Sequence, residues 1–297
     1  ATQVTTLFSL SGEVAVDRNW EIGLPFLRNF HPSEYGAQPQ IFQITQDARG
    51  VIYALDRDGI LEYDGVRWRI LARASSIGAD ESGRVFVGGM HRGEIGCLEA
   101  DDLGRMHYVS MKHLLAPEDQ NFRTISKILT TGQGVFFLSP ERILCWADDR
   151  FQSWPARSKF LSLSSSNNHR VFAVDEKDGL LEITKGKLQS MPGGNSLAGQ
   201  SLLSAVPWNY ALAGKLGSTL LVAIPFKTYL LDDKTVLPFP QGLSLFKEGL
   251  PLSDARPLPD GTLLLPMSMG GATILSTDPL IRRTLGRDQG LRNENIH

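Results

Sequence analysis

The sequence predicts an all-β fold, a β-propeller whose blades are four-stranded antiparallel sheets. One observation behind this prediction is a strand–turn–strand phrase that recurs with a mean period of about 42 residues, as expected for blades of roughly 40–45 residues. A second is the composition. With 42% hydrophobic residues, 21% charged residues and a net charge of −2, the 297-residue chain has the profile of a folded protein.

The distribution of charge and of apolar residues limits the classes of partner. A nearly neutral chain argues against a nucleic-acid partner, because phosphate binding requires a basic surface. The longest apolar run, residues 220–226, is far shorter than the roughly 18 residues of a membrane helix and contains Pro225. It is therefore interpreted as a buried strand.

Six copies of the phrase can be aligned by their first turn. The clearest copy covers residues 47–54 and continues through 56–68. The more degraded copies lie at 81–87, 132–137, 169–174, 216–222 and 259–265. These copies predict six blade-sized units at 41–73, 76–111, 124–154, 160–191, 201–239 and 253–285.

The individual elements follow from local patterns. In the first unit, Ile41, Gln43 and Thr45 alternate as in a strand, and Asp64-Gly65 predicts a tight turn before Trp68. Residues 112–123 form a polar insertion in which we expect a helical turn near 112–119. Residues 240–252 form a connector with glycine and proline. Helix is expected only in such short pieces, and strand content well above the usual 20–25% or so.

The N-terminal lead, residues 1–39, does not fit the repeat, whereas residues 40–297 consist of blades. A binding site is asymmetric, so residues that do not repeat are the better candidates for one. Those of the lead and first strand are Arg28, Asn29, His31, Tyr35, Gln38, Gln40 and Gln43. Because innermost strands line the channel of a propeller, amides there are suited to a polar ligand such as a saccharide. The alternative is that the lead only plugs or latches the propeller.

A second candidate is the polar loop within the second repeat. His91 and Arg92 follow Gly88-Gly89 in this loop, which we interpret as a ligand-contacting loop at the channel mouth. The alternative is a solvated turn.

The two cysteines are expected to remain free thiols. Cys97 and Cys145 fall at the same place in consecutive repeats, where Glu62 and Glu182 stand in the first and fourth. A whole sheet should therefore separate them. Stacked sheets lie about 10 Å apart, whereas bridged cysteines need Cα atoms within about 7 Å.

Motifs for metal binding and catalysis are weak. Asp56–Gly59 resembles the start of a calcium loop, but the later ligands of an EF-hand are missing and Asp175–Gly179 repeats the pattern in the fourth unit. We interpret both as hairpin turns and expect no metal or cofactor. Glu62, Glu99 and Glu182 recur near the same strand, which favours a structural role. No nucleophile elbow is present, so we expect no enzyme activity, although the spacing of carboxylates leaves a propeller glycosidase open.

The two ends of the sequence indicate how the repeats relate to a larger protein. Residues 290–297 look like the approach to another blade, so we expect the six repeats to be part of a seven-bladed propeller or a tandem array. Otherwise the first blade would expose apolar area on one side. Ala1 is compatible with a mature end after signal cleavage or with an arbitrary boundary.

Several segments closely resemble the start of the bacterial two-component regulator propeller proteins. The resemblance is strong over residues 20–70, moderate over 76–155 and weaker, but in register, to the end. The segments that carry it are 23–30, 34–40, 46–53 and 58–68. The fifth repeat departs from the family pattern, with 225–229 in place of a glycine-containing turn.

This resemblance implies a function. Members of the family carry extracytoplasmic ligand-sensing propellers, followed by a membrane helix and a cytoplasmic histidine kinase, diguanylate cyclase or DNA-binding regulator. It implies a periplasmic sensor that binds a polar small molecule, an oligosaccharide or a partner domain. Its other partners would be further blades and downstream domains of the same receptor, and receptor dimerisation is compatible with this role. The alternative function is a propeller glycan lyase or hydrolase. A cytosolic scaffold of the tryptophan–aspartate type is disfavoured because no repeat ends in that dipeptide.

Overall fold

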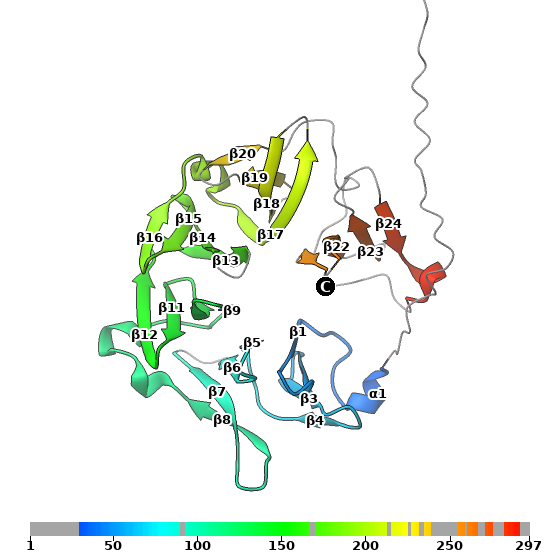
Figure 1. The fold of residues 1–297 in the computed structure, drawn as a ribbon. Coiled ribbons are helices and arrows are strands. Elements are labelled where there is room, and N and C mark those ends of the chain that lie inside the picture. The colour runs from blue at the N-terminus through cyan, green and yellow to red at the C-terminus, as the bar shows by residue number, and fades with distance from the viewer. Residues whose placement is uncertain are drawn as a thin grey trace, which may run out of the picture.

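The structure, a computed structural model, describes most of the chain after the lead. The residues described are 30–89, 93–166, 170–212, 215–224, 227–231, 235–238, 255–258, 260–266, 271–275 and 282–291. Within them the strands form six four-stranded sheets, each with strands in chain order and antiparallel neighbours. Figure 1 shows the sheets arranged around a common axis, with the first strand of each nearest to it. The chain is therefore an all-β propeller.

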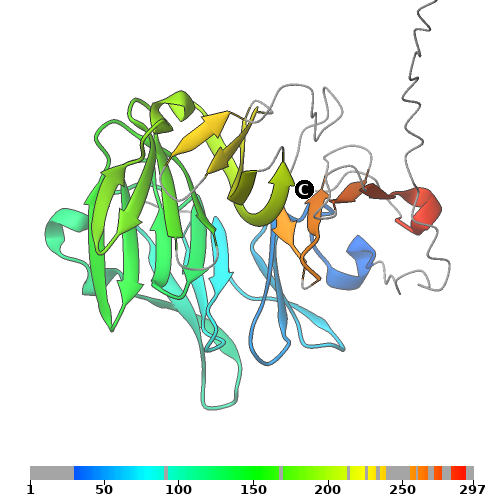
Figure 2. The same ribbon diagram turned by 45° about the horizontal axis from the view of Figure 1, so that its top comes forward.

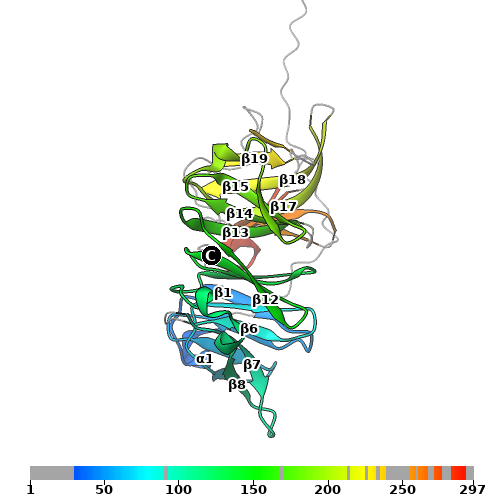
Figure 3. The ribbon, with the colours of Figure 1, turned by 90° about the vertical axis from the view of Figure 1, so that its left-hand side faces the viewer.

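The first three blades have these strands. Blade 1 consists of β1 (Gln43–Gln46), β2 (Ile52–Leu55), β3 (Ile60–Tyr63) and β4 (Trp68–Ile70). Blade 2 consists of β5 (Ser76–Ala79), β6 (Val85–Gly88), β7 (Ile95–Ala100) and β8 (Met106–Ser110). Blade 3 consists of β9 (Lys127–Thr131), β10 (Gly134–Leu138), β11 (Arg142–Ala147) and β12 (Arg150–Pro155). The hairpin of β7 and β8 projects beyond the neighbouring strands (Figure 3).

The remaining sheets complete the described chain. Blade 4 consists of β13 (Phe160–Ser166), β14 (Arg170–Asp175), β15 (Gly179–Thr184) and β16 (Lys187–Ser190). Blade 5 consists of β17 (Ser201–Leu212), β18 (Lys215–Ile224), β19 (Lys227–Leu231) and β20 (Val236–Pro238). The sixth sheet consists of β21 (Arg256–Pro257), β22 (Leu263–Pro266), β23 (Ala272–Leu275) and β24 (Arg282–Leu285). Figure 2 shows the twisted sheets side by side around the axis.

The number of blades in the structure agrees only in part with the number predicted from the sequence. Five regular blades are described. The sixth sheet is smaller, because β21 has two residues. The prediction of six full blades within a seven-bladed or tandem propeller is therefore not met by the described residues. The unusual turn predicted in the fifth repeat, at Pro225-Phe226, lies outside them, as does the whole of the 240–252 connector.

Helix occurs only in short pieces. The 3₁₀ helices η1 (Lys112–Leu114) and η2 (Pro117–Asp119) confirm the helical turns predicted near 112–119. Helix is not confined to that region, however. Short pieces also occur at α1 (Pro32–Tyr35), η3 (Gly194–Leu197) and η4 (Arg287–Gln289).

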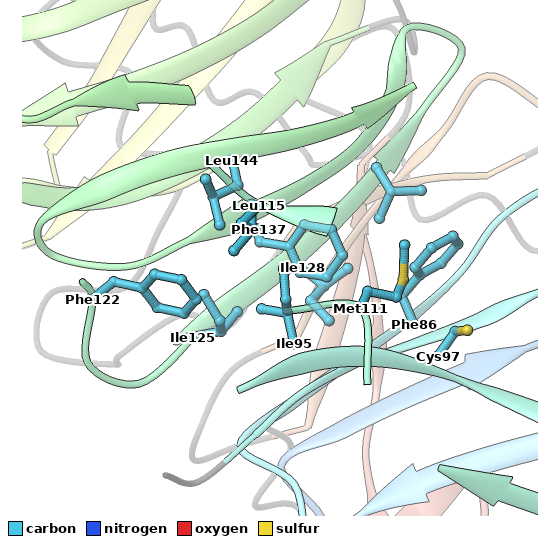
Figure 4. Packing of buried hydrophobic residues seen from close by; sticks show 11 residues of the cluster. Phe86, Ile95, Cys97, Met111, Leu115, Phe122, Ile125, Ile128, Phe137 and Leu144 are labelled. Carbon is cyan, nitrogen blue, oxygen red and sulfur yellow. The ribbon is translucent and has the colours of Figure 1, made fainter. Parts of the chain in front are cut away.

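The core is divided into clusters that fill the spaces between neighbouring blades. Between blades 2 and 3, Phe86 and Ile95 pack with Phe137 and Leu144 (Figure 4). The insertion after β8 contributes to the same cluster through the buried residues Met111, Leu115, Phe122 and Ile125. Leu115 and Phe122 lie within residues 112–123, so the segment interpreted from its sequence as a polar insertion contributes apolar side chains to an inter-blade core.

Side chains of the innermost strands bind the backbone of the next blade. The amides of Ile77 and Ala79 in β5 donate to Gln43 Oε1 and Thr45 Oγ1 of β1, at 2.9 and 3.2 Å. The same arrangement joins blades 4 and 5, where Ser162 and Ser164 accept from the amides of Leu202 and Ala205. An innermost strand has a sheet partner on one side only, so its other amides need acceptors when they are buried. We call these contacts the inter-blade hydrogen bonds.

Cys97 and Cys145 occupy equivalent positions in their blades, as predicted, and so do Glu62 and Glu182. Cys97 pairs across strands with Phe86, and Cys145 with Phe136. Both are free, buried thiols, and burial raises their pKa values to about 11 and about 12. Glu62 and Glu182 pair in the same way with Tyr53 and Phe172, and each binds an arginine of its own blade, Arg69 and Arg170 respectively. Glu99 is not equivalent to them, because it lies two residues further along its strand and is exposed.

Candidate functional site

The residues predicted to bind a ligand do not converge on one place in the described chain. Arg28, Asn29, His91 and Arg92 lie outside the described residues. Gln43 lies on the innermost strand, where its side-chain oxygen accepts the inter-blade hydrogen bond from Ile77. Gln38 and Gln40 are exposed, and the backbone amide of Gln38 donates to Asp56 Oδ2 at 3.0 Å. Gln43 thus has a structural contact, and the binding role of all the predicted residues, Gln43 included, stays a prediction.

His31 and Tyr35 belong to a short helical segment beside the outermost strand of blade 1. His31 is the N-cap of α1, and its backbone amide donates to Glu34 Oε1 at 2.6 Å, which completes a capping box. The ring of Tyr35 lies 5.7 Å from that of Trp68. Burial and the nearby Asp56 carboxylate raise the pKa of Tyr35. These contacts favour the alternative in which the lead latches blade 1.

An aromatic cluster fixes the lead to the blade. The rings of Tyr63 and Trp68 are stacked with centroids 4.8 Å apart. Phe30 packs edge-on against both, at 5.0 and 5.4 Å. Edge-to-face and offset contacts of this kind stabilise beyond the area they bury. The cluster therefore anchors the end of the lead on β3 and β4.

A pocket of about 310 Å³ is lined by the ends of the first strands of three neighbouring blades and by the turns after two of them. We call it the mouth pocket, because the innermost strands β1, β5 and β9 end there, at one end of the channel. Its lining residues are Gln46, Asp47, Ala48, Ala79, Asp80, Glu81, Thr130 and Thr131. The lining thus combines carboxylates, hydroxyls and an amide with a comparable amount of apolar surface.

The turn of blade 1 is held by its own aspartate. Asp47 is buried, and its Oδ1 accepts the amides of Arg49 and Val51 at 2.9 and 3.0 Å. The guanidinium of Arg49 binds Oδ2 at 2.7 Å. Burial opposes ionisation, but these hydrogen bonds and the charge of Arg49 outweigh it and lower the pKa of Asp47. Asp47 therefore orders the rim of the pocket, and Arg49 balances its negative charge.

Asp80 of blade 2 is the equivalent residue, with one difference that matters for binding. Its Oδ1 accepts the amides of Ser82 and Arg84, each at 3.0 Å. No arginine forms an ion pair with Asp80 in the described chain, in contrast to Asp47. Asp80 is partly exposed, and Thr130 and Thr131 of blade 3 line the same pocket. The pocket can therefore offer acceptors to hydroxyl or ammonium donors, and it disfavours anions.

The calcium-like turns are hairpins, as predicted. Asp56 Oδ1 accepts the amides of Asp58 and Gly59 at 2.7 and 2.8 Å, and Asp175 holds its own turn in the same way. Within the residues that the structure describes, no group of three or more potential metal ligands is found.

The sequence did not indicate the mouth pocket. Its residues lie in the turns that repeat along the chain, and repetition was interpreted as structural. The signal that could have found it is positional. The polar pairs at 46–47, 80–81 and 130–131 lie at or just after the end of a first strand, and these ends of neighbouring blades meet at one end of a propeller.

Comparison with known proteins supports the fold. No family model and no curated protein matches the sequence. Among solved structures, the chain is similar to the extracellular domain of the hybrid two-component system BT3049 of B. thetaiotaomicron, with a TM-score of 0.59 and 11% identity over 90% of this chain. The extracellular domain of BT4673 from the same organism gives a TM-score of 0.59 with 12% identity over 86% of this chain. This chain covers only 38% and 34% of those two chains.

An enzyme shows a similar likeness. A catalytically inactive virginiamycin B lyase from Staphylococcus aureus, solved with quinupristin, has a TM-score of 0.57 and 13% identity, over 82% of this chain and 83% of that one. Identities this low establish the fold alone, because one fold can host many functions. The fold defines the class of the protein, a β-propeller with four-stranded antiparallel blades.

Proposed function

We propose that this chain is part of the periplasmic sensory propeller of a bacterial signal-transduction receptor. It binds a polar ligand at the mouth pocket, and the receptor relays its bound state to a cytoplasmic output module. The observation that carries the proposal is the likeness to extracellular domains of hybrid two-component systems over 86–90% of the chain. Further blades and the downstream domains of the same receptor are its intramolecular partners.

The pocket suggests the class of ligand. Its volume, about 310 Å³, is at the lower end of the range of ligand pockets, roughly 300–1,000 Å³. Hydrogen-bond acceptors from three neighbouring blades line it. Both properties suit a small uncharged saccharide or the terminal unit of an oligosaccharide. A ligand shifts a receptor only through its differential affinity for two states, so modest affinity suffices.

The position of the pocket favours a sensory role. Its lining comes from blades 1, 2 and 3, so a bound molecule would contact three sheets that meet along two inter-blade cores. Binding there could change the packing of one blade against the next. Such a change is the kind of two-state rearrangement that transmits a signal.

Titration calorimetry with a panel of neutral, cationic and anionic oligosaccharides tests this proposal. At least one neutral saccharide should bind, and Asp80→Asn and Thr130→Val should each weaken it by about 5–10-fold, the equivalent of one hydrogen bond. Thr184→Val, at an exposed site at the end of β15, is the matched control and should leave binding unchanged. Binding that neither pocket variant weakens would place the ligand elsewhere, and a panel without any binder would contradict the proposal.

A second candidate function is that of a propeller lyase. The observation that favours it is the likeness to virginiamycin B lyase over 83% of that enzyme's chain. Quinupristin is therefore included in the panel as a candidate substrate. The two functions differ in whether a bound molecule is transformed.

A further inference from the structure

The outermost strand of blade 2, β8, has an unpaired backbone edge. Just after this strand, the amide of Met111 donates to the carbonyl of Ile95 at 2.9 Å, on the side of β7. Hydrogen-bonded pairs alternate along an antiparallel ladder, so His107 and Val109 also bond inward to β7. The backbone groups that point away from the sheet are therefore those of Met106, Tyr108 and Ser110. Within the described residues, no acceptor is found for these three amides.

The start of β8 extends beyond the rest of its sheet. The pairing of β6 with β7 ends at Val85 and Leu98, whereas β7 and β8 stay paired as far as Ala100 and Met106. This ribbon projects from the rim of the propeller in Figures 1 and 3. A two-stranded ribbon alone is at best marginally stable in water, so other contacts are needed to hold it in one conformation.

The turn at the end of the ribbon supplies such contacts. Asp101 Oδ1 accepts the amides of Leu103 and Arg105 at 2.9 and 2.8 Å. The guanidinium of Arg105 binds Asp101 Oδ2 at 2.9 Å. Leu103 stands on this ordered turn with 75% of its surface exposed. The edge of β8 is thus held in an extended conformation, with a large apolar side chain exposed beside it.

β8 also lacks the features by which sheets prevent edge-to-edge association. These features are short edge strands, charged side chains and proline. β8 has five residues, Met-His-Tyr-Val-Ser, with no lysine, arginine or proline among them. Each of the other outermost strands of the described sheets carries at least one such residue: Arg69 in β4, Arg150 and Pro155 in β12, Lys187 in β16, Pro238 in β20 and Arg283 in β24.

The charges that flank β8 indicate which strand its edge would accept. Before the strand, the turn carries Asp102, which is exposed, and Asp101, whose charge Arg105 balances. After the strand comes Lys112. An antiparallel strand added to this edge should therefore have an acidic residue before it and a basic residue after it. β8 itself has this order, so its edge is complementary to a second copy of itself.

We infer that β8 is the docking edge for β8 of a second copy of this chain, in an antiparallel pair with its two-fold axis at Tyr108. In this register, Met106 of each copy exchanges hydrogen bonds with Ser110 of the other, and Tyr108 with its counterpart. All the outward backbone groups of both strands are then bonded, and two blades form one continuous sheet. Lys112 of each copy comes to the turn that carries Asp102 of the other. This pairing does not depend on the proposed sensory role.

Sedimentation equilibrium and hydrogen exchange of single amides test this inference on the unmodified protein. From about 1 μM to about 1 mM protein, the mean mass should rise toward that of a dimer. The amides of Met106, Tyr108 and Ser110 should then exchange at least about tenfold more slowly. Leu188 and Ser190, whose amides point outward from β16 by the same alternation, are internal controls and should not change. A protein that stays monomeric, or a dimer without slower exchange in β8, would overturn the inference. Protection of β8 at every concentration would mean that another segment of the chain covers the edge, and would also overturn it.

Charge reversal tests the antiparallel order and distinguishes a second copy from any other partner. Asp102→Lys and Lys112→Glu should each raise the Kd of the dimer by about 3–5-fold, because each replaces an attraction by a repulsion at an exposed pair. The variant with both substitutions should return to within about twofold of the wild-type Kd, because each copy then carries the reversed pair. Lys187→Glu, an exposed change in β16, is the matched control and should have no effect. Single variants without any effect, or a double variant weaker than both, would contradict the pairing.

Discussion

Gly59→Ala should destabilise the propeller by about 3–5 kcal/mol, among the largest effects of a single methyl group. Gly59 has φ +150°, a conformation that residues with a Cβ rarely adopt, and an added Cβ would lie 2.3 Å from the carbonyl oxygen of Ala72. That oxygen cannot move easily, because it accepts the amide of Ile60 at 2.7 Å. The hairpin between β2 and β3 would have to shift to relieve the clash. Urea denaturation of the two proteins measures the difference in free energy of unfolding.

Gly65 provides the matched control for this prediction. It also has a positive φ, +95°, but an added Cβ would meet nothing within 4 Å. Gly65→Ala should therefore cost only the backbone strain, about 1–2 kcal/mol. Equal losses in the two variants would show that close packing against Ala72 contributes nothing.

Asp175→Ala should destabilise the protein by about 3–5 kcal/mol, because it removes a fully buried carboxylate that holds three backbone amides. Oδ1 accepts the amides of Lys177 and Asp178 at 3.0 and 3.2 Å, and Oδ2 accepts the amide of Ser158 at 3.1 Å. Alanine would leave these donors without their acceptor. Asp260→Ala is the control. Asp260 is exposed, and among the described residues its side chain accepts from Thr262 alone, so this substitution should cost much less than Asp175→Ala.

The effect of Asp175 should depend on pH in a defined direction. Burial opposes its ionisation, but the hydrogen bonds from Ser158 and from the turn amides outweigh burial and lower its pKa. A carboxylate with a lowered pKa stabilises the fold above its unfolded pKa of about 3.9 and loses that contribution as pH falls further. The gap between wild type and Asp175→Ala, measured by urea denaturation, should therefore be full at pH 7 and narrow below about pH 4. A gap that widens on acidification would contradict this explanation.

Much of the fold could be predicted because each blade repeats local chemistry. The turn that begins with Asp47 recurs with Asp80 because the same carboxylate accepts the same two amides in each. The equivalence of Cys97 and Cys145 could be predicted for the same reason, since the period fixes the place of a residue within its sheet.

Contacts between blades could not be predicted in this way. Gln43 and Thr45 of β1 accept hydrogen bonds from amides of β5, and which amides they reach depends on the relative position of the two strands. The sequence of a single strand does not specify that relative position. The mouth pocket depends on the same relation among three blades, so its residues resemble ordinary turns. Leu115 and Phe122 are separated by polar residues in the chain and meet only against the cluster between blades 2 and 3.

The most direct test of the central claim, that this propeller binds a polar ligand without transforming it, is the fate of the bound molecule. Protein is incubated in stoichiometric amount with each panel member, including quinupristin, and mass spectrometry of the recovered molecules detects any transformation. The account predicts that the molecule that binds is recovered with unchanged mass, and that Asp80→Asn lowers the amount bound. Conversion at an enzyme-like rate, about 1 per second or faster, would contradict the sensory account and favour the lyase.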